Sequence, residues 1–250
     1  GRFCYKAANP IIALYEANRL RQINDGAPPE RTLNVPNGIR VERFTPLRSI
    51  RPYSTPPVLC LIGRVVPIKD ITTFIRSMRR IVNKLPQAQA WIAGPVEEDP
   101  DYVQECKSLV SSLNLQNHVK FLGMQRIEDL MPLVGLVVLS SVSEALPLVI
   151  LESQAAGVPV ISTDVGSCSQ LIHGLDDEDQ RLGSCGRIVS IANPEALADA
   201  SLELLTNPEK WQEASAAGIA RVERYYTDTL LFERYQQIYD SALENSQEAH

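Results

Sequence analysis

The sequence contains 250 residues, of which 44% are hydrophobic and 22% charged, which is ordinary globular composition and excludes a disordered or collagen-like chain. The formal net charge is −6, and lysine and arginine are scattered along the chain. This distribution argues against a surface that neutralises nucleic-acid phosphates. No apolar run approaches the ~20 residues that a membrane-spanning helix requires.

The cysteine and histidine content predicts neither a disulfide framework nor a metal site. The cysteines are odd in number and include no C-x-x-C pair, and three histidines leave little room for a metal site or a catalytic triad. The cysteines are Cys4, Cys60, Cys106, Cys168 and Cys185. We expect a reducing, cytoplasmic environment, no metal and no cofactor.

The first part of the chain predicts two short strands and one helix. Residues 11–15 form an apolar run of strand length, and Glu16–Asn24 reads as a helix that ends at Asp25–Gly26. A second short strand precedes the turn at residues 35–38. Four prolines between residues 45 and 57 predict a linker and a domain boundary.

From residue 58 onward, apolar strands alternate with helices and are separated by short Gly/Pro turns. The expected strands are 58–62, 88–93, 119–122, 136–140, 158–162 and 186–189, with helices at 70–84, 102–113, 127–134 and 147–156 between them. Three further helices are expected at 194–205, 208–225 and 228–243. This alternation predicts an α/β fold, a Rossmann-like parallel sheet with helices on both faces. Ligands on such sheets bind at the carboxyl ends of the strands.

Two cations follow the first of these strands. Gly63 ends the strand, and Arg64 and Lys69 lie five residues apart in the loop behind it. A guanidinium fork and an ammonium group suit the two sides of a diphosphate. A solvated basic pair before a helix is the alternative interpretation.

A second polar loop follows the fourth strand. Glu144 lies just before a helix that Pro147 is expected to open, since proline suits a first turn. The free amides of Leu148 and Val149 would then face an anionic phosphate. Glu152 lies inside the helix among apolar neighbours, where sugar or ribose hydroxyls could satisfy its carboxylate. The alternative is a helix-dipole role for Glu144 and a surface position for Glu152.

Several segments resemble, in order, the motifs of glycosyltransferase family 4, the retaining GT-B enzymes that use nucleotide-sugar donors. Gly63-Arg64-x4-Lys69-Asp70 and Glu144-x7-Glu152 match the paired motifs of that family. Its Pro-Asn-Gly and Ala-x-Gly-x-Pro-Val elements are matched by residues 36–38 and 155–160. The resemblance covers almost the whole chain and implies the C-terminal domain of a GT-B glycosyltransferase.

Within the family, three segments resemble the PelF glycosyltransferases of Pel exopolysaccharide synthesis, a biofilm polymer. They are residues 65–70, 94–100 and 163–168. Two segments depart from the wider family: Ala145-Leu146-Pro147 stands where many relatives have Gly-Phe-Gly, and Ser167-Cys168 stands where many have a second glycine. The resemblance implies transfer of a hexose from a UDP-sugar, with UDP-glucose as the expected donor, to a growing exopolysaccharide.

The resemblance also implies roles for individual residues. Arg64 and Lys69 would bind the donor's diphosphate and stabilise the leaving nucleotide, Glu144 would face the donor sugar, and Glu152 would hold the ribose hydroxyls. The backbone at residues 123–125 would lie against a uracil base. The full predicted site consists of Gly63, Arg64, Lys69, Gly123, Met124, Gln125, Glu144, Leu148, Val149 and Glu152, of which Arg64, Lys69 and Glu144 are catalytic. No metal-binding carboxylate pair is evident, so metal-independent chemistry is expected.

The same resemblance divides the chain into three parts. Residues 1–45 would be the tail of an N-terminal acceptor domain with the interdomain linker, residues 46–228 the nucleotide-sugar donor-binding domain, and residues 229–250 a crossover helix and tail. The chain begins without methionine or a signal segment, which we interpret as a start within a longer protein. The expected partners are the UDP-sugar, the rest of the N-terminal domain and a membrane-bound synthesis complex at the inner membrane, and no nucleic acid. This fragment is expected to be inactive alone.

Two other classes of function remain open. A UDP-sugar epimerase of the same fold would release free UDP without an acceptor. A non-catalytic nucleotide-binding regulatory module would bind UDP without transfer or hydrolysis.

Overall fold

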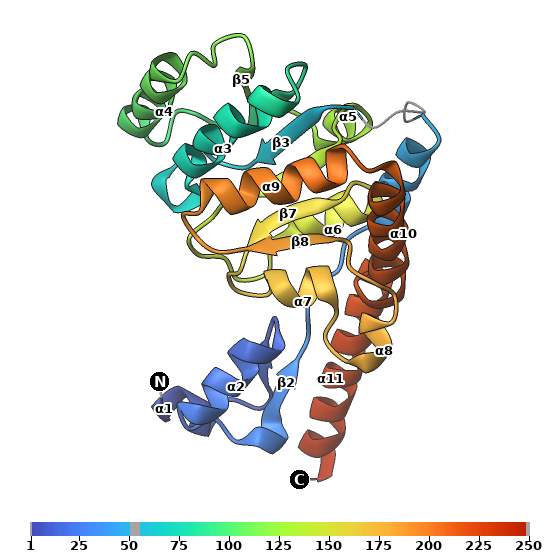
Figure 1. The fold of residues 1–250 in the computed structure, drawn as a ribbon. Helices are drawn as coiled ribbons and strands as arrows, with labels where there is room; N and C mark the ends of the chain where they lie inside the picture. The colour runs from blue at the N-terminus through green and yellow to red at the C-terminus, as the bar shows by residue number, and fades with distance from the viewer. Residues whose placement is uncertain (1, 51–55, 249–250) are drawn as a thin grey trace.

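The computed structural model describes residues 2–50 and 56–248, and within them the chain forms two parallel sheets (Figure 1). The small sheet pairs β1 (Ile11–Ala13) with β2 (Thr32–Asn34). The large sheet has six strands in the order β5-β4-β3-β6-β7-β8. Its strands are β3 (Val58–Ile62), β4 (Gln89–Ala93), β5 (Val119–Gly123), β6 (Leu136–Leu139), β7 (Val160–Thr163) and β8 (Gly186–Val189).

The helices lie in two groups: the first two are beside the small sheet, and the others cover both faces of the large sheet or extend from it (Figure 1). They are α1 (Arg2–Ala7), α2 (Glu16–Asn24), α3 (Ile71–Lys84), α4 (Pro100–Ser112), α5 (Ile127–Leu130), α6 (Leu148–Ala155), α7 (Cys168–His173), α8 (Asp177–Gln180), α9 (Pro194–Leu205), α10 (Pro208–Tyr225) and α11 (Asp228–Glu248). The predicted fold class, a parallel sheet with helices on both faces, is confirmed.

The core lies in two apolar layers, one on each face of the large sheet. Leu59 and Leu61 of β3 pack into the layer beneath α3 and α9, whereas Cys60 between them packs into the layer beneath α6 and α10. Successive side chains of a strand point to opposite faces, so a strand covered on both sides is apolar at every position. This explains the continuous apolar runs in the sequence.

The chain changes direction across the sheet between β3 and β6. From β3 it winds outward through β4 to β5, and it then returns to place β6 on the other side of β3 before continuing to β7 and β8. Parallel sheets bind ligands at such a switch point, outside the carboxyl ends of the two strands. The topology thus marks the loops after β3 and β6.

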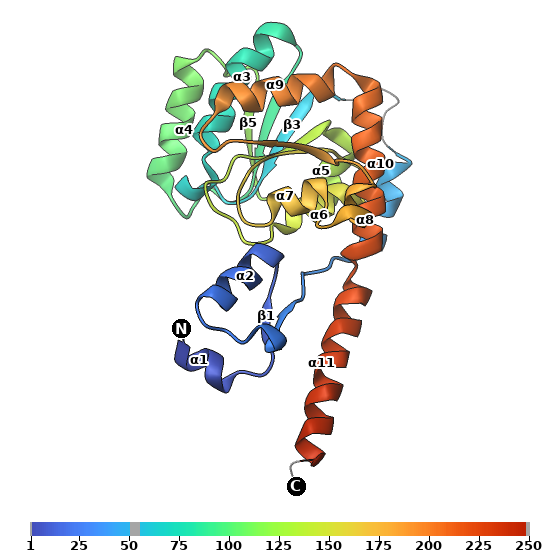
Figure 2. The ribbon, with the colours of Figure 1, turned by 60° about the horizontal axis from the view of Figure 1, so that its bottom comes forward.

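The small sheet and α2 form a separate unit beside the large sheet (Figure 2). Helix α11 projects away from the large sheet and runs alongside this unit. The segment that leads from the small sheet to the large one pairs with the turn between α10 and α11 through a parallel bridge. In this bridge the Ile39 amide donates to the Tyr226 carbonyl and the Asp228 amide donates to the Ile39 carbonyl, both at 2.9 Å. A Cβ on Gly38 would lie 2.1 Å from the Thr227 carbonyl oxygen, so this close approach requires glycine. The Pro-Asn-Gly element therefore has a structural reason here.

Three local predictions need correction. The helix expected at 102–113 begins at Pro100, because the Asp99 side chain accepts a hydrogen bond from the Tyr102 amide at 3.0 Å and caps it. The segment 127–134 divides into α5 and a 3-10 turn at Met131–Leu133. Pro147 precedes α6 with an extended backbone instead of lying in its first turn. The short helices α7 and α8 were not predicted, and residues 51–55 of the expected linker lie outside the described residues.

All five cysteines belong to the described residues and are free thiols, and four of them are buried. In the described ranges, none of the helices combines the length and apolar character needed to cross a bilayer.

Candidate functional site

The loops that follow β3 and β6 meet at the switch point of the large sheet. The Lys69 ammonium donates a hydrogen bond to Glu144 Oε1 at 2.6 Å, and both side chains are largely buried. The structure thus brings together two of the three predicted catalytic residues, although 75 positions separate them in the chain.

The loop that contains Lys69 is shaped by its own turn and is attached to the next loop. Residues Pro67–Lys69 form a 3-10 turn, and Asp70 adopts a left-handed conformation from which its side chain accepts the Thr73 amide and caps α3. Ser140 Oγ donates to the Lys69 carbonyl at 2.9 Å, and the Val142 amide donates to the Ile68 carbonyl at 2.9 Å. The position of Lys69 is therefore determined by the loop after β6.

Glu144 is held by the loops around it. Ser141 Oγ donates to Glu144 Oε1 at 2.7 Å, and Thr163 at the end of β7 donates to the Ser141 carbonyl at 2.6 Å. Gly166 has a φ of +56°, and a Cβ there would lie 2.3 Å from the Glu144 carbonyl oxygen. The loop after β7, residues 164–167, therefore packs against the backbone of Glu144 at a contact that only glycine allows.

Arg64, the third predicted catalytic residue, lies beyond Gly63 at the end of β3. Its Nη1 donates to Glu98 Oε1 at 2.5 Å, and more than half of the side chain is exposed. Gly63 itself donates its amide to the Ala93 carbonyl at 2.9 Å and so continues the ladder between β3 and β4. Both predicted phosphate-binding cations therefore have carboxylate partners in the structure.

Glu152 lies on α6, as predicted, in a partly apolar environment. Burial raises the pKa of the Glu152 carboxyl, while the Arg43 guanidinium acts to lower this pKa and the Glu128 carboxylate to raise it. Leu148 and Val149 open α6, where backbone amides have no acceptor within the helix. The helix start and Glu152 thus offer an amide cluster and a carboxylate on the same element.

The three predicted base-contacting residues lie at the end of the edge strand β5 and in the loop after it. Gly123 ends β5, Met124 is exposed, and the Gln125 side chain donates to the Leu122 carbonyl at 2.8 Å. Helix α5 follows, and its Glu128 accepts a hydrogen bond from Arg43 Nε at 3.0 Å. The charges of Glu128 and Arg43 both act on the pKa of Glu152, which links α5 electrostatically to α6.

Four residues that the sequence interpretation missed complete this region: Arg43, Glu98, Glu128 and Ser141. Glu98 lies within the quoted segment 94–100, but nothing local indicates that it pairs with Arg64. Arg43 stands in the stretch that connects the two sheets, and its guanidinium also lies 5.5 Å from the centre of the Phe44 ring. Ser141 lies in the same loop as Glu144, whereas only the tertiary structure brings Arg43, Glu98 and Glu128 to the site.

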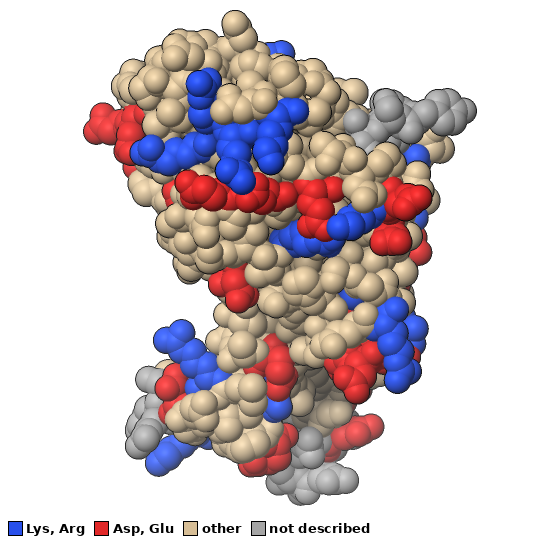
Figure 3. All heavy atoms as spheres, viewed as in Figure 1, with Lys and Arg blue, Asp and Glu red and all other residues tan. Residues whose placement is uncertain are grey.

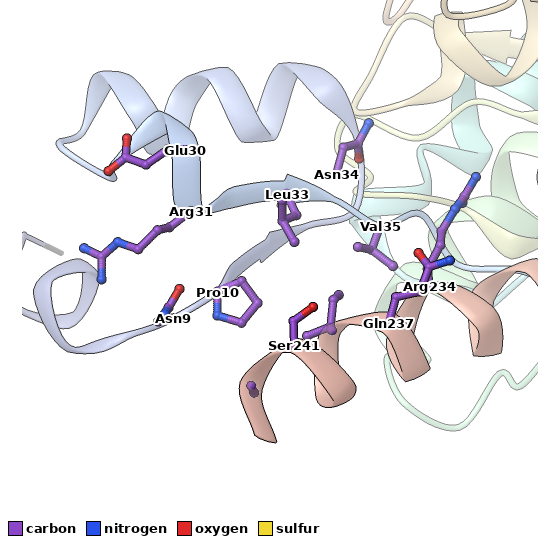
Figure 4. A pocket seen from close by; sticks show the side chains of 12 residues that line it. Asn9, Pro10, Glu30, Arg31, Leu33, Asn34, Val35, Arg234, Gln237 and Ser241 are labelled. Carbon is purple, nitrogen blue, oxygen red and sulfur yellow. The ribbon is translucent and has the colours of Figure 1, made fainter. Parts of the chain in front are cut away.

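Other surface features lie outside the predicted site. A cavity of about 460 Å³ between the small sheet and α11 contains none of the predicted residues (Figure 4). Lysine and arginine side chains gather above a band of acidic residues on one face (Figure 3). There the α3 cations Arg76, Arg79, Arg80 and Lys84 line a shallow cavity beside Glu195 of α9. Within the described ranges, no group of three or more His, Cys, Asp or Glu side chains is placed to hold a metal ion.

Comparison with known families agrees with this geometry. The family model for glycosyl transferases group 1 matches residues 44–221, which is most of the chain and the entire large sheet. The chain belongs to this family. A second model, a domain of unknown function named DUF3492, matches residues 1–30 of this group 1 glycosyltransferase.

Curated relatives are similar at the level of a divergent family. The chain is 26% identical over 227 residues to a GDP-mannose-dependent monoacylated alpha-(1-6)-phosphatidylinositol monomannoside mannosyltransferase from Corynebacterium glutamicum, covering 83% of this chain and 56% of that protein. It is also 26% identical over 241 residues to a D-inositol 3-phosphate glycosyltransferase from Streptomyces scabiei, covering 90% and 52%. The chain therefore spans about half the length of these relatives.

Solved structures of glycosyltransferases share the fold. HepE from Anabaena, solved with UDP and glucose, superposes with a TM-score of 0.78 at 22% identity, over 94% of this chain and 64% of that one. TarM from S. aureus, solved with UDP among its ligands, superposes with a TM-score of 0.74 at 21% identity, over 94% and 44%. At these identities the similarity establishes the fold alone.

Proposed function

We propose that this chain is the nucleotide-sugar-binding half of a retaining glycosyltransferase that transfers a hexose from a UDP-sugar, with UDP-glucose as donor. One observation carries the proposal: Arg64, Lys69 and Glu144 follow β3 and β6, the two strands that flank the switch point of the sheet. Cations and a carboxylate at this place suit a ligand with a diphosphate and a sugar.

In the proposed reaction, the bond between the sugar C1 and the diphosphate oxygen breaks, and its electron pair stays on the diphosphate. The oxygen of an acceptor hydroxyl forms the new bond to C1, and its proton passes to the leaving diphosphate. Negative charge grows on that leaving group while the sugar ring gains positive character. Lys69, Arg64 and the amides of Leu148 and Val149 stabilise the growing negative charge, and Glu144 faces the sugar. Groups that are already in place contribute most to such stabilisation, because they need no reorganisation during the reaction. The protein cations supply this charge, so the reaction needs no metal and no cofactor.

UDP is the preferred nucleotide in this proposal. Structures with a similar fold contain UDP, in one case with glucose, which supports a UDP-sugar. The mannosyltransferase relative that depends on GDP-mannose supports the competing choice of GDP. In this proposal residues 123–125 lie beside the base and select between UDP and GDP.

The acceptor and the assembly follow from the resemblance to PelF enzymes. We propose that the acceptor is a growing exopolysaccharide and that a further N-terminal domain of the same protein binds it. The proposed place of action is the cytoplasmic side of the inner membrane, within a synthesis complex. The match of a separate family model to residues 1–30 supports a second domain.

Calorimetric titration of UDP, ADP and GDP into the chain tests the proposal. We expect selective binding of UDP, weakened roughly tenfold or more by Lys69→Ala and by Glu152→Ala. Lys84→Ala is the matched control, since it removes an exposed charge from the far end of α3 and should leave the affinity within about twofold. Equal affinity for all three nucleotides, or insensitivity to both site substitutions, contradicts the assignment.

A second measurement separates transfer from simple binding. A protein that also carries the proposed N-terminal domain should release UDP from UDP-glucose and form polymer, with or without EDTA. UDP binding without UDP release identifies a regulatory module instead, and UDP release without a glycosidic product identifies an epimerase-type enzyme.

A further inference from the structure

Two ion pairs neutralise the cations of the proposed diphosphate site. Arg64 Nη1 donates to Glu98 Oε1 at 2.5 Å, and the Lys69 ammonium donates to Glu144 Oε1 at 2.6 Å. Two cations and two carboxylates together have no net charge. A diphosphate therefore gains the full attraction of either cation only after the carboxylate of that cation has moved away.

The two pairs differ in how firmly they are held. The side chains of Lys69 and Glu144 are 19% and 14% exposed, and Ser141 donates a second hydrogen bond to Glu144 Oε1. The side chains of Arg64 and Glu98 are 56% and 49% exposed, and within residues 2–50 and 56–248 no other hydrogen bond reaches the Glu98 carboxylate. Water screens an exposed pair strongly, so the Arg64–Glu98 pair opens at the lower cost.

The backbone on which Glu98 stands is anchored beside the loop of Arg64. The Val65 amide donates to the Pro95 carbonyl at 3.0 Å, which ties together the loops after β3 and β4. Beyond Glu98, Tyr102 of α4 accepts the Ile71 amide on its hydroxyl at 2.9 Å. Because both flanks are fixed, rotation of the Glu98 side chain alone is enough to release Arg64.

We propose that Glu98 is a displaceable counterion of Arg64, which it binds before the donor arrives and releases to the donor's diphosphate. The inference rests on the proposed function, because it takes Arg64 as a ligand of the diphosphate. Glu98 acts through Arg64 and is therefore a positioning residue. An isolated anion gains little by replacing one carboxylate, whereas a diphosphate that also reaches Lys69 and α6 gains several contacts at once. The exchange thus favours diphosphate ligands over nucleosides.

Titrations of UDP, uridine and inorganic pyrophosphate into the wild-type chain, Glu98→Gln and Glu97→Gln test the proposal. Glu97→Gln is the matched control, because it removes the same charge from the same exposed loop, but the Glu97 carboxylate accepts the Val96 amide at 3.0 Å instead of Arg64. Glu98→Gln should tighten UDP and pyrophosphate binding roughly two- to fivefold and leave uridine binding unchanged. Glu97→Gln should have a clearly smaller effect. In an Arg64→Gln background, Glu98→Gln should have no effect.

Two results would overturn the inference while leaving the proposed function intact. If Glu98→Gln and Glu97→Gln tightened UDP binding equally, the effect would come from the change in net charge and not from release of Arg64. Weaker UDP binding by Glu98→Gln would show that Glu98 orients Arg64 for the phosphate. If the wild-type chain binds pyrophosphate but not UDP, and Glu98→Gln tightens the pyrophosphate, the nucleotide assignment fails and the counterion exchange holds. If neither ligand binds, both proposals fail.

Discussion

The Lys69 ammonium lies 2.6 Å from Glu144 Oε1, so that one ion pair joins the ends of the two strands that flank the switch point. The pair is largely shielded from water, and Ser141 supplies a second donor to the carboxylate. An ion pair in this position both holds the two loops together and places the cation at the proposed leaving group.

Substitution of the cation and substitution of the carboxylate of this pair should affect UDP binding differently. Lys69→Ala removes the cation and leaves Glu144 without its counterion, so UDP affinity should fall roughly tenfold or more and the free energy of unfolding by about 1–2 kcal/mol. Glu144→Gln leaves the cation available, so UDP affinity should be unchanged or higher while sugar transfer by the longer protein is lost. Calorimetry and a transfer assay measure the two effects. Equal loss of UDP affinity in both variants contradicts the assigned roles.

The partly buried carboxylate of Glu152 should lower the free energy of unfolding at neutral pH. Burial raises the pKa of its carboxyl above the usual value of 4.5. The stability that the protonated form contributes is present below that value and is lost as the pH rises through the raised pKa. Glu152→Gln should therefore raise Tm at pH 7 by roughly 1–3 °C, and by less at pH 4, while it weakens UDP binding.

Thermal unfolding at the two pH values checks this, with Glu213→Gln on the exposed side of α10 as the control. A lower Tm for Glu152→Gln at pH 7 would show that the carboxylate forms a stabilising contact.

The buried pair Arg221–Asp179 should dominate the stability of the segment between α7 and β8. Their side chains are 0% and 4% exposed, and Arg221 Nε donates to Asp179 Oδ1 at 2.6 Å. Arg221 also donates to the Ile172 and Gly183 carbonyls at 2.9 and 2.8 Å. Arg221→Met leaves the buried Asp179 carboxylate without a counterion and should reduce the free energy of unfolding by about 3–5 kcal/mol.

The neighbouring Arg224→Met is the matched control for this measurement by urea denaturation. Arg224 lies on the same helix and pairs with Glu178 at the exposed surface, so its loss should cost less than about 1 kcal/mol. If both variants lost a similar free energy of unfolding, the buried pair would be no more stabilising than the exposed one, and the prediction would be wrong.

Glu203 should contribute to stability in a pH-dependent way. Arg187 and Lys210 both donate to its carboxylate and lower its pKa from 4.5 to about 2. A lowered pKa in the folded state means that the contribution is present above pH 4.5 and is lost as the pH falls toward 2. The difference in unfolding free energy between wild type and Glu203→Gln should therefore shrink between pH 5 and pH 2.5. Glu105→Gln on the exposed face of α4 should show no such trend, and a constant difference for Glu203→Gln would contradict the prediction.

Much of the fold could be predicted because helix caps and apolar runs mark where its helices and strands lie along the chain. The predicted bounds of α9 and α10 coincide with the structure, where Asn193 and Asn207 cap the two helices by accepting the amides of Ala196 and Lys210. The apolar runs predicted the strands because a strand covered on both faces must be apolar throughout. Pro147 was placed wrongly, because proline is compatible both with a first helical turn and with the extended residue before it.

The candidate site was predictable only in part. Gly63 directly follows an apolar run, and Lys69 and Glu144 lie in the loops that follow two such runs. The carboxyl ends of parallel strands lie on one edge of a sheet. The partners Glu98 and Arg43 have no such signal, since their contacts depend on which loops the strand order makes neighbours.

The sequence by itself determined the parallel α/β class, the order of strands and helices along the chain, and the loops in which polar residues follow buried strands. These properties are local, because hydrophobic periodicity and helix caps act over a few residues. Only the tertiary structure decided that β6 lies beside β3, that Lys69 meets Glu144, and that Arg64 meets Glu98. Those contacts join residues 75 and 34 positions apart, and they form because burial of the apolar sheet selects one strand order and thereby one set of neighbouring loops.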